Sequence, residues 1–200
     1  MVGGVALALV PGIKSLPKRG IVRPPGALPE DEFVSTCIVC QECVRGCPTN
    51  GLQPALLEAG IGAMGTPYIA PRKGGCLLNR SCSNLCAKVC PVGAIQVIDQ
   101  AKMKVGLAVV ARDRCLAWAQ GAKCLVCAEA CPTEAATPHQ GRVFVNPAKC
   151  SGCGICEKAC PVVDSAIHVT LEQEVRYARG QAPLPPADKG TGGRDETGKT

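Results

Sequence analysis

The sequence predicts an α+β fold in which short hairpins and helical turns recur along the chain. Three observations carry this prediction. Four clusters of cysteines each end in a Cys-Pro pair, the β-branched runs VGLAVV and VFV precede the last two clusters, and the similar phrases PVGAIQV and PVVDSAIHV follow the second and fourth pairs. A pattern that recurs in this way indicates one small unit of loop, helix, strand, turn and strand used several times.

Composition divides the chain into three parts. Residues 1–31 form an extended N-terminal segment rich in proline and glycine, residues 32–179 carry every cysteine, and residues 180–200 are expected to be a disordered tail without apolar periodicity. The acidic run at residues 29–32 is expected to begin a helix before Phe33. A second short helix is expected at residues 54–59, within the insertion between the first two cysteine clusters.

Large core-forming side chains are scarce. The 200 residues include five aromatic side chains, at Phe33, Tyr68, Trp118, Phe144 and Tyr177, against sixteen cysteines. Aromatic residues bury the most area per side chain, so an ordinary hydrophobic core would be thin. The cysteines are therefore expected to help hold the fold together.

The sixteen cysteines form four quartets with none left over. The first quartet, CIVCQECVRGCP, and the fourth, CSGCGICEKACP, have the C-x2-C-x2-C-x3-C-P spacing of bacterial iron–sulfur loops. The second and third, C-x5-C-x3-C-x3-C and C-x8-C-x2-C-x3-C, are less regular, and Cys76 fits its quartet least well. The quartets are Cys37, Cys40, Cys43, Cys47; Cys76, Cys82, Cys86, Cys90; Cys115, Cys124, Cys127, Cys131; and Cys150, Cys153, Cys156, Cys160.

This pattern predicts four [4Fe-4S] clusters with all sixteen cysteines as ligands. A short loop can offer three thiolates to one cluster, and the proline after the last cysteine fixes the exit of the loop. Structural zinc would favour paired C-x2-C knuckles or histidine ligands, and the chain has two histidines, His139 and His168. A disulfide framework is typical of short secreted scaffolds. Both alternatives are therefore disfavoured.

The fourth cysteine of such a loop binds the other cluster of a pair, so the quartets should pair into bacterial two-cluster ferredoxin-like modules, in tandem or nested. The nested arrangement is the favoured one, and sequential pairing of first with second and third with fourth remains open, since the gap from Cys131 to Cys150 is short. Nesting predicts four ligand sets: Cys37, Cys40, Cys43 and Cys160; Cys150, Cys153, Cys156 and Cys47; Cys76, Cys82, Cys86 and Cys131; and Cys115, Cys124, Cys127 and Cys90.

Charge gives no sign of nucleic-acid binding. The formal charge of +6 counts the cysteines as neutral. Sixteen thiolates with four oxidised clusters would bring the net charge to about −2, because ligation requires deprotonated thiols.

No stretch reaches the 18 apolar residues typical of a membrane span. The opening MVGGVALALVPG resembles the end of an export signal.

No catalytic set stands out, so the sequence predicts no catalytic residue. Every cysteine is assigned to a cluster, and the terminal Gly-Lys-Thr lacks P-loop spacing. Trp118 could cover a cluster, but ordinary core packing is favoured, and His168 is expected on the surface of a strand.

Several phrases beyond the cysteines carry a family resemblance. RPPGALPEDEF, GTPYIAPR, CAKVCPVGAI, MKVGLAVV and CSGCGICEKAC occur in this order, and over residues 21–179 the chain closely resembles the NapG/MauM family of ferredoxin-type proteins. The resemblance implies four [4Fe-4S] clusters, a membrane-embedded NapH-like quinol dehydrogenase partner, and a periplasmic location associated with the membrane through that partner. Two departures from the family are the spacing around Cys76 and the lack of a twin-arginine motif, since Lys18-Arg19 is followed by Gly-Ile-Val. The true start could lie upstream of Met1, and a cytoplasmic location is the alternative.

The expected function is electron transfer rather than catalysis. The resemblance implies a relay from a membrane quinol dehydrogenase towards a periplasmic reductase such as nitrate reductase. Two alternatives are a ferredoxin-like subunit of a soluble molybdenum or tungsten oxidoreductase and a MauM-type maturation factor for a quinoprotein dehydrogenase.

Overall fold

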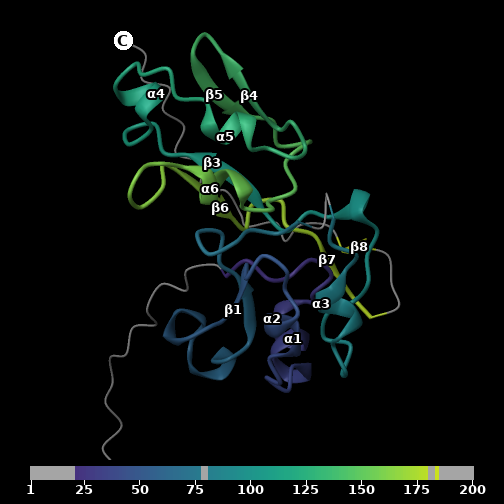
Figure 1. The fold of residues 1–200 in the computed structure, drawn as a ribbon. Coiled ribbons are helices and arrows are strands. Elements are labelled where there is room, and N and C mark those ends of the chain that lie inside the picture. Colours follow the sequence, from purple (N-terminus) through teal and green to yellow (C-terminus); the bar gives the residue numbers. More distant parts are fainter. Residues whose placement is uncertain (1–20, 78–80, 180–182, 185–200) are drawn as a thin grey trace, which may run out of the picture.

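The computed structural model describes residues 21–77, 81–179 and 183–184, arranged as two lobes. Figure 1 shows α1, α2, α3 and β1 in the lower lobe and α4, α5, α6 and β3–β6 in the upper lobe. We call residues 21–105 the N-terminal lobe and residues 106–170 the C-terminal lobe. The chain then returns to the N-terminal lobe, where Tyr177 packs in the core and its hydroxyl donates to the carbonyl of Lys102 at 2.6 Å.

The N-terminal lobe begins with the expected acidic helix. Helix α1 spans Glu30–Thr36, and its first turn holds Glu30, Asp31 and Glu32, where carboxylates favour the positive end of the helix dipole. Its Phe33 is fully buried, in the same core cluster as Leu28 and Ile95. Leu28 and other residues from position 22 onward, in the segment expected to precede the cysteine domain, thus belong to this core; residues 1–20 and most of the 180–200 tail lie outside the described residues.

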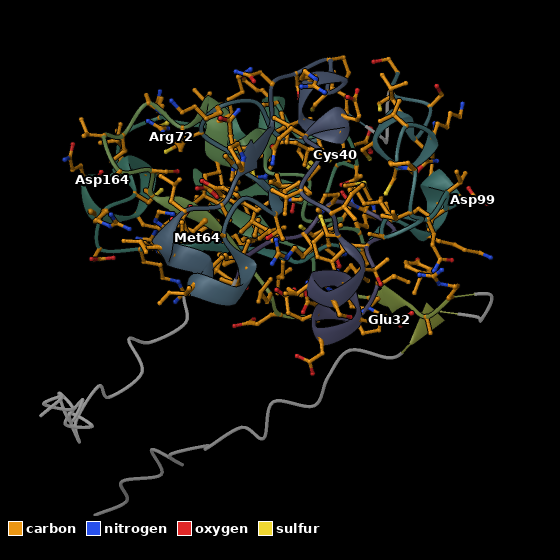
Figure 2. All side chains as sticks on the ribbon, turned by 90° about the horizontal axis from the view of Figure 1, so that it is seen from below. Glu32, Cys40, Met64, Arg72, Asp99 and Asp164 are labelled. Atoms are coloured by element: carbon orange, nitrogen blue, oxygen red, sulfur yellow. The ribbon has the colours of Figure 1, made fainter. Side chains whose placement is uncertain are left out.

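The insertion between the first two quartets forms a hairpin with two turns. Strands β1 (Leu52–Pro54) and β2 (Pro67–Ile69) pair antiparallel, with Leu52 opposite Ile69. Between them lie two short 3-10 turns, η1 (Leu57–Ala59) and η2 (Ile61–Ala63), so the helix expected at residues 54–59 is reduced to a single turn after a strand. Met64 follows η2 on the surface of the molecule (Figure 2).

The C-terminal lobe repeats this plan with longer strands. Strands β4 (Ala136–His139) and β5 (Arg142–Val145) form a hairpin between the third and fourth quartets. The two-residue loop between them has positive φ at Gln140 and Gly141, as a type I′ turn requires. Strand β3 (Leu107–Val110), before the third quartet, pairs antiparallel with β6 (Ile167–Thr170), after the fourth.

The N-terminal lobe has the counterpart of the β3–β6 pair. Ala27, before the first quartet, forms an antiparallel bridge with Ile95, after the second. Each lobe therefore holds two consecutive quartets, an intervening hairpin and a pairing of the segments that enter and leave it. This confirms a small mixed fold of helices and strands, in which consecutive quartets share a lobe.

Each quartet contains a short helix around its third cysteine, and these helices pack in pairs. Helix α2 (Glu42–Arg45) contacts α3 (Leu85–Lys88), and α5 (Val126–Glu129) contacts α6 (Ile155–Ala159). Three of these helices begin after a residue in the left-handed region, Gln41, Asn84 or Gly154. The remaining elements are α4 (Leu116–Ala119), η3 (Gln100–Lys102), β7 (Arg176–Tyr177) and β8 (Pro183–Leu184).

Small residues and cysteines make up much of the core, as the composition predicts. The core of the N-terminal lobe includes Cys43 and Cys86 beside Phe33, and a core cluster of the C-terminal lobe includes Cys150 and Cys156 beside Ile167. Among residues 21–77, 81–179 and 183–184, no helix has the length and hydropathy to span a membrane.

Candidate functional site

The cysteines of each lobe assemble into groups of four that cross between consecutive quartets. We name them by their members. The first thiol group is Cys37, Cys40, Cys43 and Cys90; the second is Cys47, Cys76, Cys82 and Cys86; the third is Cys115, Cys124, Cys127 and Cys160; the fourth is Cys131, Cys150, Cys153 and Cys156.

Three of these groups line cavities of closely similar size. The space between atoms at the cavity of the second group, part of it open to solvent, is about 370 Å³, and the corresponding spaces are about 340 Å³ at the first group and about 350 Å³ at the third. Apolar side chains complete each wall, for example Ile95 in the first, Ile69 in the second and Ile167 in the third. Within the described part of the chain, no three Cys, His, Asp or Glu side chains are placed to hold a single metal ion.

The fourth group is identified by the mutual influence of its thiols. Burial raises the pKa of Cys156, and the neighbouring Cys153 and Cys150 raise it further, followed by Cys127 and Cys131. Cys150, Cys153 and Cys156 are all buried. The influence of Cys127 on Cys156 also shows that the third and fourth groups are neighbours.

The same reasoning places the first group beside the second. Burial raises the pKa of Cys86 to about 12, with further contributions from Cys82 and from Cys43 of the first group. The pKa of Cys43 is likewise raised to about 12, by burial and then by Cys37, Cys90 and Cys40.

The thiols are grouped differently from the nested pairing expected from the sequence. That pairing would place Cys160 with the first three cysteines of the chain, whereas Cys160 lines the cavity of the third group and Cys90 lines that of the first. Cys47 likewise joins Cys76, Cys82 and Cys86. Consecutive quartets meet because one hairpin separates them and their helices pack together, and closing a short loop loses less chain entropy than closing a long one.

Cys76, the least regular position, lies with its expected partners. It lines the same cavity as Cys82 and Cys86, so the altered spacing of the second quartet does not remove it from the group. Its backbone N–H also donates to the carbonyl of Cys153 at 2.7 Å, which brings the second and fourth groups together across the two lobes.

Hydrogen-bond donors converge on the fourth cysteine of three quartets. Burial tends to raise the pKa of Cys47, but hydrogen bonds from the Thr49 hydroxyl and from nearby backbone N–H groups outweigh it, and the pKa is lowered. The pKa of Cys131 is lowered against burial by the N–H of Ala136 and by the hydroxyl and N–H of Thr133.

Cys160 has the same kind of environment. Burial again opposes ionisation of its thiol, and the N–H groups of Ala166 and Val162 lower its pKa. The Ala166 N–H lies 3.3 Å from its Sγ. Donors directed at sulfur favour the thiolate form, which is the form that binds metal.

Thr49 and Thr133 were not found by sequence reasoning, although the sequence contains a signal. The residue after each Cys-Pro pair is threonine in the first and third quartets and valine in the second and fourth. Because the two side chains have nearly the same shape, the difference lies in the hydroxyl group.

Trp118 and His168 each contact neighbouring residues of the fold. The indole N–H of Trp118 donates to the carbonyl of Val143 at 3.2 Å, and the guanidinium groups of Arg112 and Arg142 lie 4.4 and 4.8 Å from its ring. It packs on the β4–β5 hairpin, in agreement with the packing role favoured from sequence. His168 lies on β6, and its Nε2 is 2.6 Å from Nη2 of Arg114.

The donor set fits an iron–sulfur cluster. Four thiols surround each apolar cavity, three loops direct donors at sulfur, and [4Fe-4S] clusters are held by four cysteine thiolates whose sulfurs accept hydrogen bonds. This fold and this site define a ferredoxin-type [4Fe-4S] protein. Proteins of this class are small and transfer electrons.

Comparison with known proteins agrees with this class. The family described as "4Fe-4S binding domain" matches residues 141–162. The methylamine utilization ferredoxin-type protein MauM of Methylorubrum extorquens is 37% identical over 195 residues, which cover 90% of this chain and 86% of the relative. The ferredoxin-type protein NapG of Escherichia coli is 41% identical over 167 residues, covering 74% and 69%. The chain belongs to the NapG/MauM family of ferredoxin-type proteins.

The similarity to a chain of known structure is weaker. That chain comes from a formate dehydrogenase–heterodisulfide reductase–formylmethanofuran dehydrogenase complex of Methanospirillum hungatei, at 20% identity over 70% of this chain and 52% of that one. The TM-score of 0.24 is too low to bear on the fold.

Proposed function

We propose that the protein binds four [4Fe-4S] clusters, one in each thiol group, and conducts electrons one at a time between two docked redox partners. The observation that carries the proposal is the assembly of all sixteen cysteines into four groups of four, two in each lobe. Each lobe then acts as a two-cluster module in which the fourth cysteine of one quartet binds the cluster of the next. When bound, the clusters supply reversible one-electron chemistry.

The chain's own residues prepare these sites. Apolar walls keep water from the thiols, and the backbone donors at Cys47, Cys131 and Cys160 stabilise the anionic form of the ligands. Before metal uptake, burial keeps the pKa of Cys127 at about 11 and that of Cys43 at about 12, so these thiols release protons as they become ligands.

We infer that the electron donor is a membrane-embedded, NapH-like quinol dehydrogenase subunit and that the acceptor is a periplasmic reductase such as nitrate reductase. The similarity to NapG, and that to the ferredoxin-type protein NapF of Escherichia coli at 29% identity over 146 residues, supports this assignment. The protein would then work on the periplasmic side of the membrane, held there by its partner.

The similarity to MauM favours a second candidate, a role in maturing a quinoprotein dehydrogenase. A gene deletion separates the two. If the protein is a relay, partner activity is retained with artificial electron donors and lost with quinol; if it is a maturation factor, activity is lost with both. A third candidate, a subunit of a soluble molybdenum or tungsten oxidoreductase, predicts copurification with a large cofactor-binding chain.

Iron analysis of anaerobically purified protein tests the cluster count. We expect about sixteen irons per chain, four for each cluster. Replacing Cys43 by serine should remove or alter one cluster. Wild-type protein that is colourless and contains zinc would refute the proposal.

A further inference from the structure

The residue that follows the Cys-Pro pair differs between the two quartets of the C-terminal lobe. Thr133 stands two residues after the fourth cysteine of the third quartet, and Val162 stands at the same place in the fourth quartet. The chain crosses between quartets, so Cys131 belongs to the fourth group and Cys160 to the third. Backbone N–H groups approach both sulfurs, and a hydroxyl also approaches each of them, that of Thr133 at Cys131 and that of Ser165 at Cys160. The Ser165 hydroxyl donates to the carbonyl of Ile167 at 2.7 Å, so its proton is directed at another acceptor.

The Thr133 hydroxyl is directed at a ligand sulfur. Its Oγ1 lies 3.6 Å from the Sγ of Cys131, within the range of hydrogen bonds to sulfur. In the described part of the chain this sulfur is its one hydrogen-bond partner, so its proton is available to a thiolate that has no proton of its own. Thr49 differs, because its hydroxyl also donates to the carbonyl of Gly75 at 2.7 Å and shares its proton between two acceptors.

Other groups around the fourth thiol group act in the same direction. The N–H of Ala108 lies 3.5 Å from the Sγ of Cys150. The ammonium group of Lys104 lies 2.6 Å from the carbonyl oxygen of Cys150, which brings a positive charge to this group. Reduction adds a negative charge to a cluster, and donors and cations near its sulfurs stabilise that added charge.

We propose that Thr133 sets the reduction potential of the cluster held by Cys131, Cys150, Cys153 and Cys156. Its hydroxyl donates a hydrogen bond to the Cys131 sulfur and makes this cluster easier to reduce than it would be with valine at this position, the residue that stands two positions after Cys160. The inference rests on the proposed function, since it needs a cluster in each group. The step concerned is the addition of one electron to an oxidised [4Fe-4S] cluster, supplied by an external reductant.

A redox titration of the holo-protein, monitored by electron paramagnetic resonance, tests the proposal. Wild type is compared with Thr133→Val, which keeps the shape and removes the hydroxyl, and with Thr133→Ser, which keeps the hydroxyl. We expect Thr133→Val to lower the midpoint potential of one cluster, with a change of about tenfold in its reduction equilibrium, or about 59 mV for one electron. Thr133→Ser should retain the wild-type value.

Val162→Thr is the matched variant that adds a hydroxyl group instead of removing one. It introduces a hydroxyl at the equivalent position and should raise the midpoint of a different cluster. Iron content should be unchanged in all three variants.

Three results would overturn the inference: midpoints that do not move in Thr133→Val, an equal shift in Thr133→Ser, or loss of iron in Thr133→Val, which would give Thr133 a structural role. A failure of the proposed function looks different, because the wild type itself would then lack [4Fe-4S] signals and iron.

Discussion

The backbone N–H of Cys76 donates a hydrogen bond of 2.7 Å to the carbonyl of Cys153, and these two residues belong to thiol groups in different lobes. Further contacts cross the same junction. Arg72 donates to the carbonyls of Glu157 and Cys160, at 3.1 and 2.9 Å, and lies in Figure 2 on the same side of the molecule as Asp164. The second and fourth groups therefore lie on either side of this junction, and Cys160 of the third group also contacts it.

The junction can be disturbed through Gly75. A Cβ added there would lie 3.1 Å from the carbonyl oxygen of Cys153 and 3.2 Å from the nitrogen of Ile155. Gly93 is a matched control with almost the same φ, +65° against +67°, and open space around its Cβ position. Both alanine variants carry the same backbone strain, so we expect Gly75→Ala to lower the free energy of unfolding of the holo-protein by about 1–2 kcal/mol more than Gly93→Ala. Denaturant unfolding measures the difference, and equal losses would show that the junction tolerates the change.

The buried Arg23 is expected to be a main support of the N-terminal lobe. Its side chain is 1% exposed and forms two hydrogen bonds with the carboxylate of Glu30, at 3.0 and 2.5 Å. It also donates to the Thr66 hydroxyl at 2.8 Å and to the Pro67 carbonyl at 2.9 Å, which ties α1 to the β1–β2 hairpin.

We expect Arg23→Met to lower the free energy of unfolding by about 2–4 kcal/mol, because buried acceptors lose their donor. Arg45 is the control. It pairs with Glu42 but is 65% exposed, and Arg45→Met should change stability by about 0.5 kcal/mol or less. Thermal and denaturant unfolding of the two variants measure this contrast, and similar losses would contradict the role given to Arg23.

Removal of the metal is expected to abolish cooperative unfolding. The cores of both lobes include cysteines of the thiol groups, and few large apolar residues would remain to hold the lobes together without clusters. Small metal-dependent domains commonly lack a stable apo state. Chelation under anaerobic conditions should therefore give a chain without a sigmoidal melting curve, and a retained sharp transition would show that packing alone suffices.

Much of the site could be predicted from local sequence. Cysteine spacing predicted the three thiols that each quartet contributes to one group, because short loops around a cluster impose a recognisable local pattern. The acidic run before Phe33 likewise identified α1, because helix starts favour carboxylates.

The partner of each fourth cysteine could not be predicted in this way. Cys90 and Cys160 both end a loop in Cys-Pro, and their destinations depend on which helices pack together and which segments form hairpins. These are long-range contacts that spacing does not encode. The Thr49 and Thr133 hydroxyls had a sequence signal, but their meaning depends on knowing which group each preceding cysteine enters.

The central claim is that each thiol group is completed by the fourth cysteine of the consecutive quartet, and spectroscopy of single cysteine variants tests it most directly. Cys43→Ser, Cys90→Ser, Cys127→Ser and Cys160→Ser are compared by electron paramagnetic resonance of the reduced holo-protein. We predict that Cys43→Ser and Cys90→Ser perturb the same cluster signal, and that Cys160→Ser perturbs the signal that Cys127→Ser perturbs. If Cys160→Ser instead changed the signal affected by Cys43→Ser, the assignment of the four groups would be contradicted.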